Sequence, residues 1–216
     1  NRFTPGTGLV AGFSPQTVPD KPLWNNILFV DSLAAAFVSA ATIGWGRGVT
    51  CTGRNLAYRK QAYKDVQGFS STPDQLSGDD DFLLSSIARH PVWQVTYTFQ
   101  RKSCVPAQGP PTLKAFWKQK RRHLSAGRSY STTSKIGYGI YHSLNLILWS
   151  GLFWFPGILA LALKWIIDFS VLRWTSRKPG GTFRMPAFAL WECFFPLYHI
   201  LLTPLALRKT QSWKGT

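Results

Sequence analysis

Three long apolar stretches in the last third of the chain constrain its fold more than any other feature. They cover residues 136–155, 158–172 and 186–207. About twenty apolar residues in a helix cross the ~30 Å hydrocarbon core of a bilayer. We therefore expect two to three transmembrane helices in a membrane region over residues 136–216. Glu192 and two prolines interrupt the third stretch, which leaves open whether it spans fully, kinks or re-enters.

The charge of the chain indicates which side of a membrane the polar part faces. The formal net charge is +16, and no acidic residue occurs between Asp81 and Asp168. The basic residues in that gap run directly into the first apolar stretch, which is typical of a cytoplasmic membrane surface that contacts anionic lipid. We expect a multi-pass protein of the cytoplasmic (inner) membrane with membrane lipids as partners. The apolar stretches disfavour nucleic-acid binding, the other common explanation of a basic chain.

The local patterns predict an α/β fold before the membrane region. A proline-rich linker precedes a helix that carries lysine and arginine on one face, and residues 106–135 are therefore interpreted as a linker and an amphipathic interface helix. The alternative is a surface helix that packs on its own domain. Within the preceding part, we expect a loop or an irregular edge over 1–22 and a buried or half-buried helix over 23–45, which its polar residues favour over a membrane span. We then expect a strand, turn and strand over 49–59, a short helix over 60–66, a helix from Asp79 to about Arg89 and a strand over 92–100. In the membrane region, Pro156 and Gly157 are expected to form a turn, and residues 173–181 a basic loop.

Three consecutive aspartates, Asp79, Asp80 and Asp81, form the densest acidic cluster. Adjacent carboxylates repel each other and raise at least one pKa, which suits a general base or a metal ligand. The alternative is an ordinary solvated helix N-terminus, where the helix dipole favours acidic side chains. The three cysteines show no metal-ligand spacing, so we predict no metal site in this chain.

Three segments, in order, carry a resemblance to a known family. They are Cys51-Thr52-Gly53-Arg54-Asn55-Leu56-Ala57-Tyr58-Arg59 followed by Gly68-Phe69, then Gly78-Asp79-Asp80-Asp81-Phe82-Leu83-Leu84, and then Gln119-Lys120-Arg121-Arg122-His123. The closing Trp213-Lys214-Gly215 adds a fourth. Together they resemble the family 2 glycosyltransferases of the GT-A fold, a group that includes cellulose- and hyaluronan-synthase-like and ceramide-glucosyltransferase-like membrane enzymes of bacteria.

The resemblance implies roles for the matching residues. Asp80 is expected to be the catalytic base and Asp79 to position it, with Asp81 as the base if the motif is shifted by one residue. Arg122 is expected to face the diphosphate with Gln119 as its hydrogen-bond partner. His123 stands where the family has tryptophan, which argues against a processive polymer synthase. The residues expected to line the acceptor pocket are Cys51, Thr52, Gly53 and Asn55.

The resemblance also implies a reaction and a missing part. It implies inverting transfer of a sugar from a nucleotide-sugar donor to a hydroxyl of a lipid or glycan acceptor. Mg²⁺ or Mn²⁺ is expected for the full-length enzyme, held by an Asp-x-Asp motif in an N-terminal half. No Asp-x-Asp occurs outside residues 79–81, so residues 1–105 resemble the C-terminal, acceptor-side half of the catalytic domain. Alone, such a chain is expected to bind no nucleotide sugar and turn over nothing.

A different class of function remains an alternative. A non-catalytic basic membrane protein that binds anionic lipid or a partner would also be rich in lysine and arginine next to apolar helices. In such a protein the aspartates at 79–81 would serve only as the start of a helix. Replacing Asp80 distinguishes the two interpretations.

Overall fold

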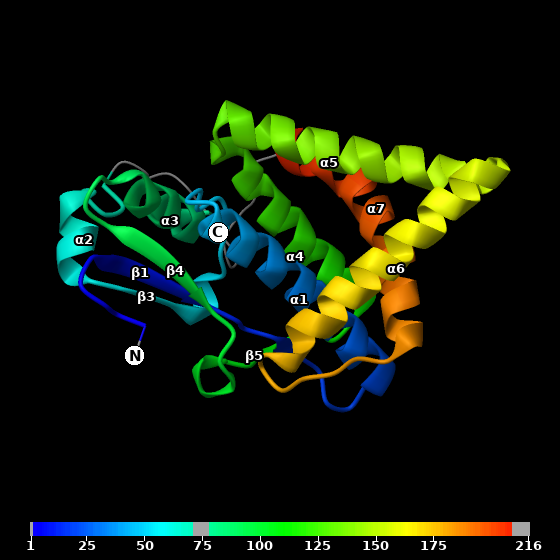
Figure 1. Ribbon diagram of the computed structural model, residues 1–216, viewed down its shortest axis with the longest axis horizontal. Coiled ribbons are helices and arrows are strands. Elements are labelled where there is room, and N and C mark those ends of the chain that lie inside the picture. The colour runs from blue at the N-terminus through cyan, green and yellow to red at the C-terminus, as the bar shows by residue number, and fades with distance from the viewer. Residues whose placement is uncertain (1, 71–77, 209–216) are drawn as a thin grey trace.

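The computed structural model describes residues 2–70 and 78–208 and shows a mixed α/β fold (Figure 1). A small sheet with two short helices lies at one end, and the helices of the apolar region lie at the other. The predicted α/β class with apolar helices after it is confirmed. Ser77 and the closing Trp213-Lys214-Gly215 lie outside the described residues.

A three-stranded sheet organises the polar part of the chain. Its central strand is β1 (Thr7–Gly12), which pairs antiparallel with β3 (Leu56–Tyr58) and parallel with β4 (Gln94–Thr98). A second, two-stranded ribbon joins β2 (Gln16–Thr17) to β5 (Ala107–Gln108) in parallel. The strand predicted over 92–100 is therefore confirmed.

The loop predicted over residues 1–22 is wrong, because β1 lies there as the most buried strand. Its glycines permit close packing and do not mark a loop. A Cβ on Gly8 would lie 2.9 Å from the Cβ of Trp93, and one on Gly12 would lie 2.5 Å from Nδ2 of Asn55. A glycine in a strand interior is typical of such close approach.

The segment predicted as strand, turn and strand over 49–59 agrees with the structure only in its second half. Its first half is not a strand, and a 3₁₀ turn, η1 (Gly53–Asn55), leads into β3. The helices on either side of the undescribed residues 71–77 agree with the prediction: α2 (Lys60–Asp65) and α3 (Asp79–Arg89). Both contact the sheet, and their shared core contains Leu9, Ala11, Ile43, Ala62, Leu83, Leu84 and Ile87.

The half-buried helix predicted over 23–45 is α1 (Pro22–Gly44), and it joins the two ends of the molecule. It contacts β4 on one side and the helices of the apolar region on the other. Its buried residues Val30, Leu33 and Ala36 belong to a core cluster with residues from far along the chain, namely Phe13, Leu172, Phe183, Phe188 and Trp191. The sheet and the apolar helices therefore share one core through α1.

The predicted amphipathic helix is α4 (Leu113–Ser125). The hydroxyl of Thr112 caps it by accepting a hydrogen bond from the backbone nitrogen of Ala115 at 3.2 Å. Short 3₁₀ turns, η2 (Arg101–Ser103) and η3 (Ala126–Ser129), lie before and after this region. Phe116 is buried and faces α1 and α7, so α4 packs within the protein along one side.

The apolar region forms α5 (Thr132–Ser150), α6 (Phe155–Arg177) and α7 (Met185–Arg208), with the turn η4 (Gly151–Phe153) after α5. Among the described residues, the helices long and apolar enough to cross a membrane are α1, α6 and the part of α7 from Met185 to Pro204. The first predicted span, over residues 136–155, is not among them, and its helix α5 ends at Ser150.

Two further boundaries differ from the prediction. Pro156 and Gly157 do not form a separate turn between helices but lie in the first turn of α6. Proline is tolerated there because the backbone nitrogens of the first helical turn have no partner within the helix. Helix α6 then continues through the first half of the predicted basic loop at 173–181 and ends at Arg177. Helix α7 contains both Pro196 and Pro204 within one continuous helix.

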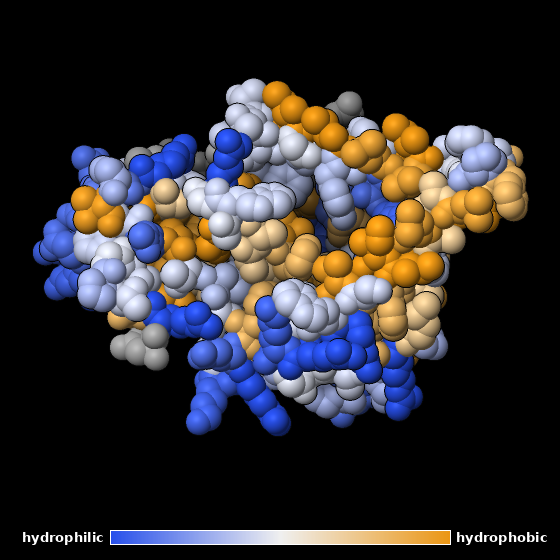
Figure 2. Space-filling model, in the orientation of Figure 1, coloured by the Kyte–Doolittle hydropathy of each residue, from blue (hydrophilic) through white to orange (hydrophobic). Residues whose placement is uncertain are grey.

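The outer face of α5 and α6 is apolar (Figure 2), whereas the surface around the sheet is mostly hydrophilic. The exposed apolar side chains of α5, η4 and α6 include Ile147, Phe153 and Ile166, of which 64%, 90% and 63% of the surface is accessible. A contiguous exposed apolar surface on a pair of helices is typical of contact with lipid or another protein.

Candidate active site

The three aspartates enter the site from the first turn of α3, at different depths. Gly78 precedes them with φ of +95°, a left-handed conformation that favours glycine. Asp79 is exposed, Asp80 is half-buried and Asp81 is buried. The dipole of α3 favours negative charge at this end, but the crowding of three carboxylates opposes it.

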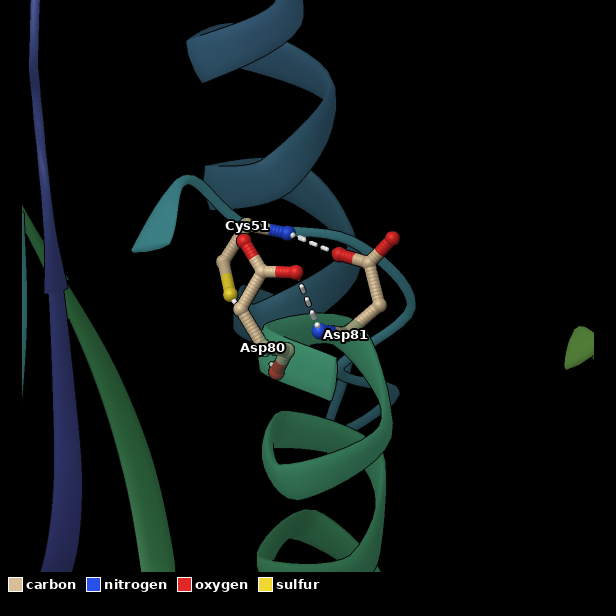
Figure 3. Close-up of side chains that lie close together, drawn as sticks. All are labelled: Cys51, Asp80 and Asp81. Atoms are coloured by element: carbon tan, nitrogen blue, oxygen red, sulfur yellow. Dashed lines mark hydrogen bonds between the residues drawn. The ribbon is translucent and has the colours of Figure 1, made fainter. Parts of the chain in front are cut away.

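Asp81 is held in place through both of its carboxylate oxygens. Oδ1 accepts a hydrogen bond from the backbone nitrogen of Cys51 at 2.8 Å (Figure 3), and Oδ2 accepts one from the hydroxyl of Tyr130 at 2.8 Å. Burial, and then the charge of Asp80, raise the pKa of Asp81 to about 7, although these hydrogen bonds act in the opposite direction. Asp81 therefore changes its charge near neutral pH.

Asp80 is the more accessible member of the pair. Its Oδ2 accepts a hydrogen bond from the backbone nitrogen of Gly53 at 2.7 Å, and its Oδ1 accepts one from that of Asp81 at 3.1 Å. Burial raises the pKa of Asp80 and the charge of Asp79 adds to this effect, while the Gly53 bond lowers it. A carboxylate with a raised pKa, oriented by backbone donors and still open to solvent, can accept a proton from a substrate.

The segment predicted to line the acceptor pocket serves partly as a support for these carboxylates. Cys51 and Gly53 donate the backbone hydrogen bonds already described, and Thr52 lies half-buried between them. The side-chain amide of Asn55 donates to the backbone oxygens of Phe13 at 2.9 Å and Ser103 at 2.8 Å. Asn55 therefore ties η1 to the end of β1, and its amide hydrogens are used within the protein.

The side chains of Cys51, Asp80 and Asp81 also form a group that could hold a metal ion, since one ligand atom of each lies within 4.8 Å of the others. The donor set does not fit Mg²⁺ or Mn²⁺, which prefer oxygen ligands. Burial and the three aspartates raise the pKa of the Cys51 thiol well above its usual range, so the sulfur stays protonated. This group therefore fits neither Mg²⁺ nor Mn²⁺.

The helix that carries the third motif ends against the aspartates. A Cβ on Gly78 would lie 2.9 Å from the Cβ of Ala126, the residue that follows α4. Together with the Tyr130–Asp81 bond, this contact brings the end of α4 to the start of α3. Arg122 lies one turn before Ala126, and its Nη2 is 3.4 Å from Nε2 of the exposed His123.

One predicted contact in this motif is not formed. The side-chain oxygen Oε1 of Gln119 is buried and has no hydrogen-bond partner among residues 2–70 and 78–208. The expected hydrogen bond from Arg122 to Gln119 is therefore absent.

A buried ion pair fixes α4 in position from its other side. Nζ of Lys120 lies 2.5 Å from Oδ2 of Asp31 on α1, and Asp31 is only 4% exposed. The other oxygen of Asp31 accepts hydrogen bonds from Nε1 of Trp191 at 3.3 Å and from the hydroxyl of Tyr198 at 3.1 Å. Helices α1, α4 and α7 therefore meet at one carboxylate.

A family model described as "Glycosyl transferase family group 2" matches residues 10–207. The chain belongs to this glycosyl transferase family. No curated protein and no solved structure gave a match. The match covers the acidic cluster and both of the other motifs within one stretch, as the order of the motifs in the sequence predicts.

Some residues at or near the site of this glycosyl transferase family group 2 member were not singled out by the motifs. Tyr130 follows the third motif and has no pattern of its own, so no sequence signal marks it. Arg54 lies inside the first motif but was given no role. Asp31 carried a usable signal, because a carboxylate in an apolar helix must find a partner when that helix is buried.

Proposed function

We propose that this chain is the acceptor-side part of an inverting glycosyltransferase that moves a sugar from a nucleotide-sugar donor to a hydroxyl of a lipid or glycan acceptor. The family match supports sugar transfer in general. Helices α6 and α7, which follow residue 135 and are long and apolar enough to cross a membrane, support a membrane location. We assign the protein to the inner membrane, with residues 1–105 on the cytoplasmic side and residues 106–135 at the interface.

The observation that carries the proposal is the different exposure of the two neighbouring carboxylates. Asp80 is held by two backbone N–H groups and remains accessible, so it can reach an acceptor hydroxyl. Asp81 lies buried behind it and is bound by Cys51 and Tyr130. We therefore assign the catalytic base to Asp80, and to Asp81 and Asp79 the role of raising its proton affinity.

The reaction follows from this assignment. The acceptor oxygen forms a bond to the anomeric carbon, and its proton passes to Asp80. The bond between that carbon and the diphosphate oxygen breaks, and its electron pair leaves with the nucleoside diphosphate. Attack from the face opposite the leaving group inverts the anomeric configuration. Arg122 at the end of α4 stabilises the negative charge that develops on the leaving group.

The donor requires further groups. Because no Asp-x-Asp occurs outside residues 79–81, we propose that the nucleoside, and a Mg²⁺ or Mn²⁺ ion, bind to residues that are not part of this chain. The ion would neutralise diphosphate charge. Residues 1–216 alone are then expected to transfer no sugar.

The deciding experiment is Asp80→Asn in the full-length protein, reconstituted in nanodiscs and tested with a panel of nucleotide sugars. We expect the rate of transfer to fall by roughly a hundredfold to ten-thousandfold, the usual contribution of a general base. Exposed Asp20 provides the control, since Asp20→Asn removes the same charge at a position outside the site and is expected to leave the rate unchanged.

Two outcomes count against the proposal. Unchanged transfer by a folded Asp80→Asn protein would favour the non-catalytic basic membrane protein as the alternative. A product with the same anomeric configuration as the donor, measured by proton NMR, would rule out the inverting mechanism.

A further inference from the structure

The loop between α6 and α7 is short, basic and folded closely against the end of α6. The backbone nitrogen of Gly180 donates to the backbone oxygen of Arg177 at 3.1 Å. That of Gly181 donates to the backbone oxygen of Ser176 at 2.9 Å. Gly180 has φ of +76°, which permits this return of the chain. The basic side chains of the loop are therefore held next to those of the last turn of α6.

Further contacts bring other basic residues to the same surface. A Cβ on Gly180 would lie 3.2 Å from Cδ of Arg101, so the turn η2 lies against the loop. The guanidinium of Arg173 bonds to the hydroxyl of Thr182, two residues before Arg184. Strongly hydrophilic side chains gather at the lower edge of the view, below the apolar surface of α6 (Figure 2). We define the α6–α7 basic patch as Arg101, Arg173, Arg177, Lys178 and Arg184; Arg173 is half-buried and the others are exposed.

Few acidic side chains oppose the charge of this patch. The chain has nine acidic residues, of which the structure describes all but Asp74. Those bound to lysines outside the patch are Asp31, Asp168 and Glu192. Those at the sheet end, apart from the loop in Figure 1, are Asp65, Asp79, Asp80 and Asp81. Exposed Asp20, just before α1, is the remaining one, and Lys21 follows it directly. Among the described residues, none of the five cations of the patch takes part in an ion pair.

The patch lies where α6 leaves its apolar surface. The side chain of Ile167 is exposed on α6, and Trp174 follows two turns later, roughly 10 Å along the helix. Trp174 is 56% exposed, and Nζ of Lys178 lies 3.8 Å from the centre of its ring. An exposed tryptophan with a cation beside it, at the end of an apolar helix, is typical of the headgroup level of a bilayer.

We propose that the α6–α7 basic patch binds the phosphate of an anionic phospholipid, in the leaflet on the side of the sheet. The inference rests on the membrane location proposed above and extends it by naming a lipid class and its site. Arginine presents several N–H donors in a plane that matches two phosphate oxygens, and lysine adds a point charge. The acyl chains lie along the exposed apolar side chains of α6 next to the patch. This adjoining apolar surface favours a lipid over a soluble anion or an acidic protein segment.

The site is separate from the basic stretch that precedes the apolar region in the sequence. Arg173, Arg177, Lys178 and Arg184 all follow Asp168, and the folded loop brings Arg101 to them. The patch therefore tests a different part of the chain from the basic face of α4.

Native mass spectrometry of the full chain in detergent resolves individual lipid-bound states and gives a dissociation constant for each added lipid. We expect phosphatidylglycerol to bind roughly fivefold or more tightly than phosphatidylcholine with the same acyl chains, since one basic residue near an anionic surface contributes about that factor. Lys178→Gln combined with Arg184→Gln should remove most of this preference and leave the affinity for phosphatidylcholine unchanged. In wild type, the preference should decrease as the salt concentration rises, which needs no variant.

The matched control is Lys60→Gln combined with Lys64→Gln, which removes two exposed cations from α2 at the sheet end. It should keep the preference for phosphatidylglycerol. Equal affinity of wild type for the two lipids, or an equal loss in the control, would overturn the inference. Glycerol phosphate is the soluble form of the headgroup, and displacement of the lipid by it at equal concentration would assign the patch to a free anion instead.

The measurement needs no sugar donor, so its result does not depend on transferase activity. A wild-type protein that binds both lipids equally contradicts only the inference. One that binds neither lipid counts against the membrane location as well.

Discussion

Asp80 and Asp81 are consecutive residues in one helix turn, but their carboxylates have different surroundings and hence different uses. Asp81 has 8% of its surface exposed and Asp80 is only half-buried. Removing a carboxylate from water disfavours its charged form, and a second carboxylate beside it adds to the effect. We therefore expect the buried residue to act on its neighbour and the accessible one to contact substrate.

The raised pKa of Asp81 predicts a stability that depends on pH. Its folded-state pKa of about 7 lies above the ordinary value of 3.8, so the protonated form is favoured in the folded state. This contribution is fully present below about pH 4 and is lost as pH rises through about 7. At about pH 8, Asp81→Asn is expected to raise the free energy of unfolding by up to about 4 kcal/mol, at about 1.36 kcal/mol per pKa unit.

The measurement is the thermal unfolding midpoint of wild type and Asp81→Asn between about pH 4 and 8. The unfolding midpoint of wild type should fall over that range as pH rises, and most of this fall should be absent in Asp81→Asn. Asp79→Asn, on the exposed side of the turn, serves as the comparison and should follow wild type. A decline of equal size in Asp81→Asn would show that other groups cause it.

The motifs predict single residues by their amino-acid types, namely the aspartates and the arginine of the third motif. The structure packs the residues just after α4, which carries this arginine, against the start of α3, which carries the aspartates. Tyr130 could not be found, because a tyrosine after a helix has no pattern, and its contact with Asp81 joins residues 49 positions apart. The partner expected for Gln119 was wrong because spacing in a helix does not determine which way a side-chain carbonyl turns.

At the scale of elements, the junction between α3 and α4 depends on a single glycine. Gly78 has φ of +95°, and a Cβ there would lie 2.9 Å from the Cβ of Ala126. Gly78→Ala is expected to cost about 1–2 kcal/mol in backbone strain alone. Chemical denaturation should detect this loss. Gly44→Ala is the control, because Gly44 ends α1 with no atom near its Cβ position, and it should cost little or nothing.

The ion pair between α1 and α4 predicts a second effect. Lys120→Met leaves the buried carboxylate of Asp31 without its cation, which costs about 3–5 kcal/mol for a buried pair. The double variant with Asp31→Asn should lose less than the sum of the two single variants, because an amide needs no counter-ion. A double-mutant cycle measures this coupling, and strictly additive losses would contradict it.

Helix prediction from sequence worked better than strand prediction, for a physical reason. Helices α3 and α4 have local signals, namely an acidic first turn and an amphipathic period. The bounds predicted for α3 agree with the structure, and α4 lies within the predicted range 106–135. Strand β1 has neither alternation nor β-branched residues at most positions, and its glycines resemble a loop. Its partners lie about fifty and ninety residues away, so only the folded chain shows that those glycines provide close contact.

The whole molecule presents an apolar face on α5 and α6 (Figure 2), and its position in a bilayer can be tested. In a background with alanine at Cys51, Cys104 and Cys193, cysteine at position 166 should react slowly with a water-soluble maleimide in proteoliposomes. Cysteine at position 177, at the end of α6, should react quickly. Both positions are exposed in the protein itself, so only lipid distinguishes them. Equal rates would place this part of α6 outside the membrane.

The meeting of three helices at Asp31 has a mechanical consequence. Trp191 and Tyr198 on α7 both donate to this carboxylate, which holds Lys120 between Gln119 and Arg122. These bonds connect α7, an apolar helix, to α4, which carries the arginine that we propose to bind the diphosphate. Bilayers of different thickness impose different tilts on a helix that they contain. For the membrane enzyme proposed above, we therefore expect a tilt of α7 to move α4, and Arg122 with it, through Asp31 and not through the sheet, so that the rate of transfer depends on the thickness of the surrounding lipid.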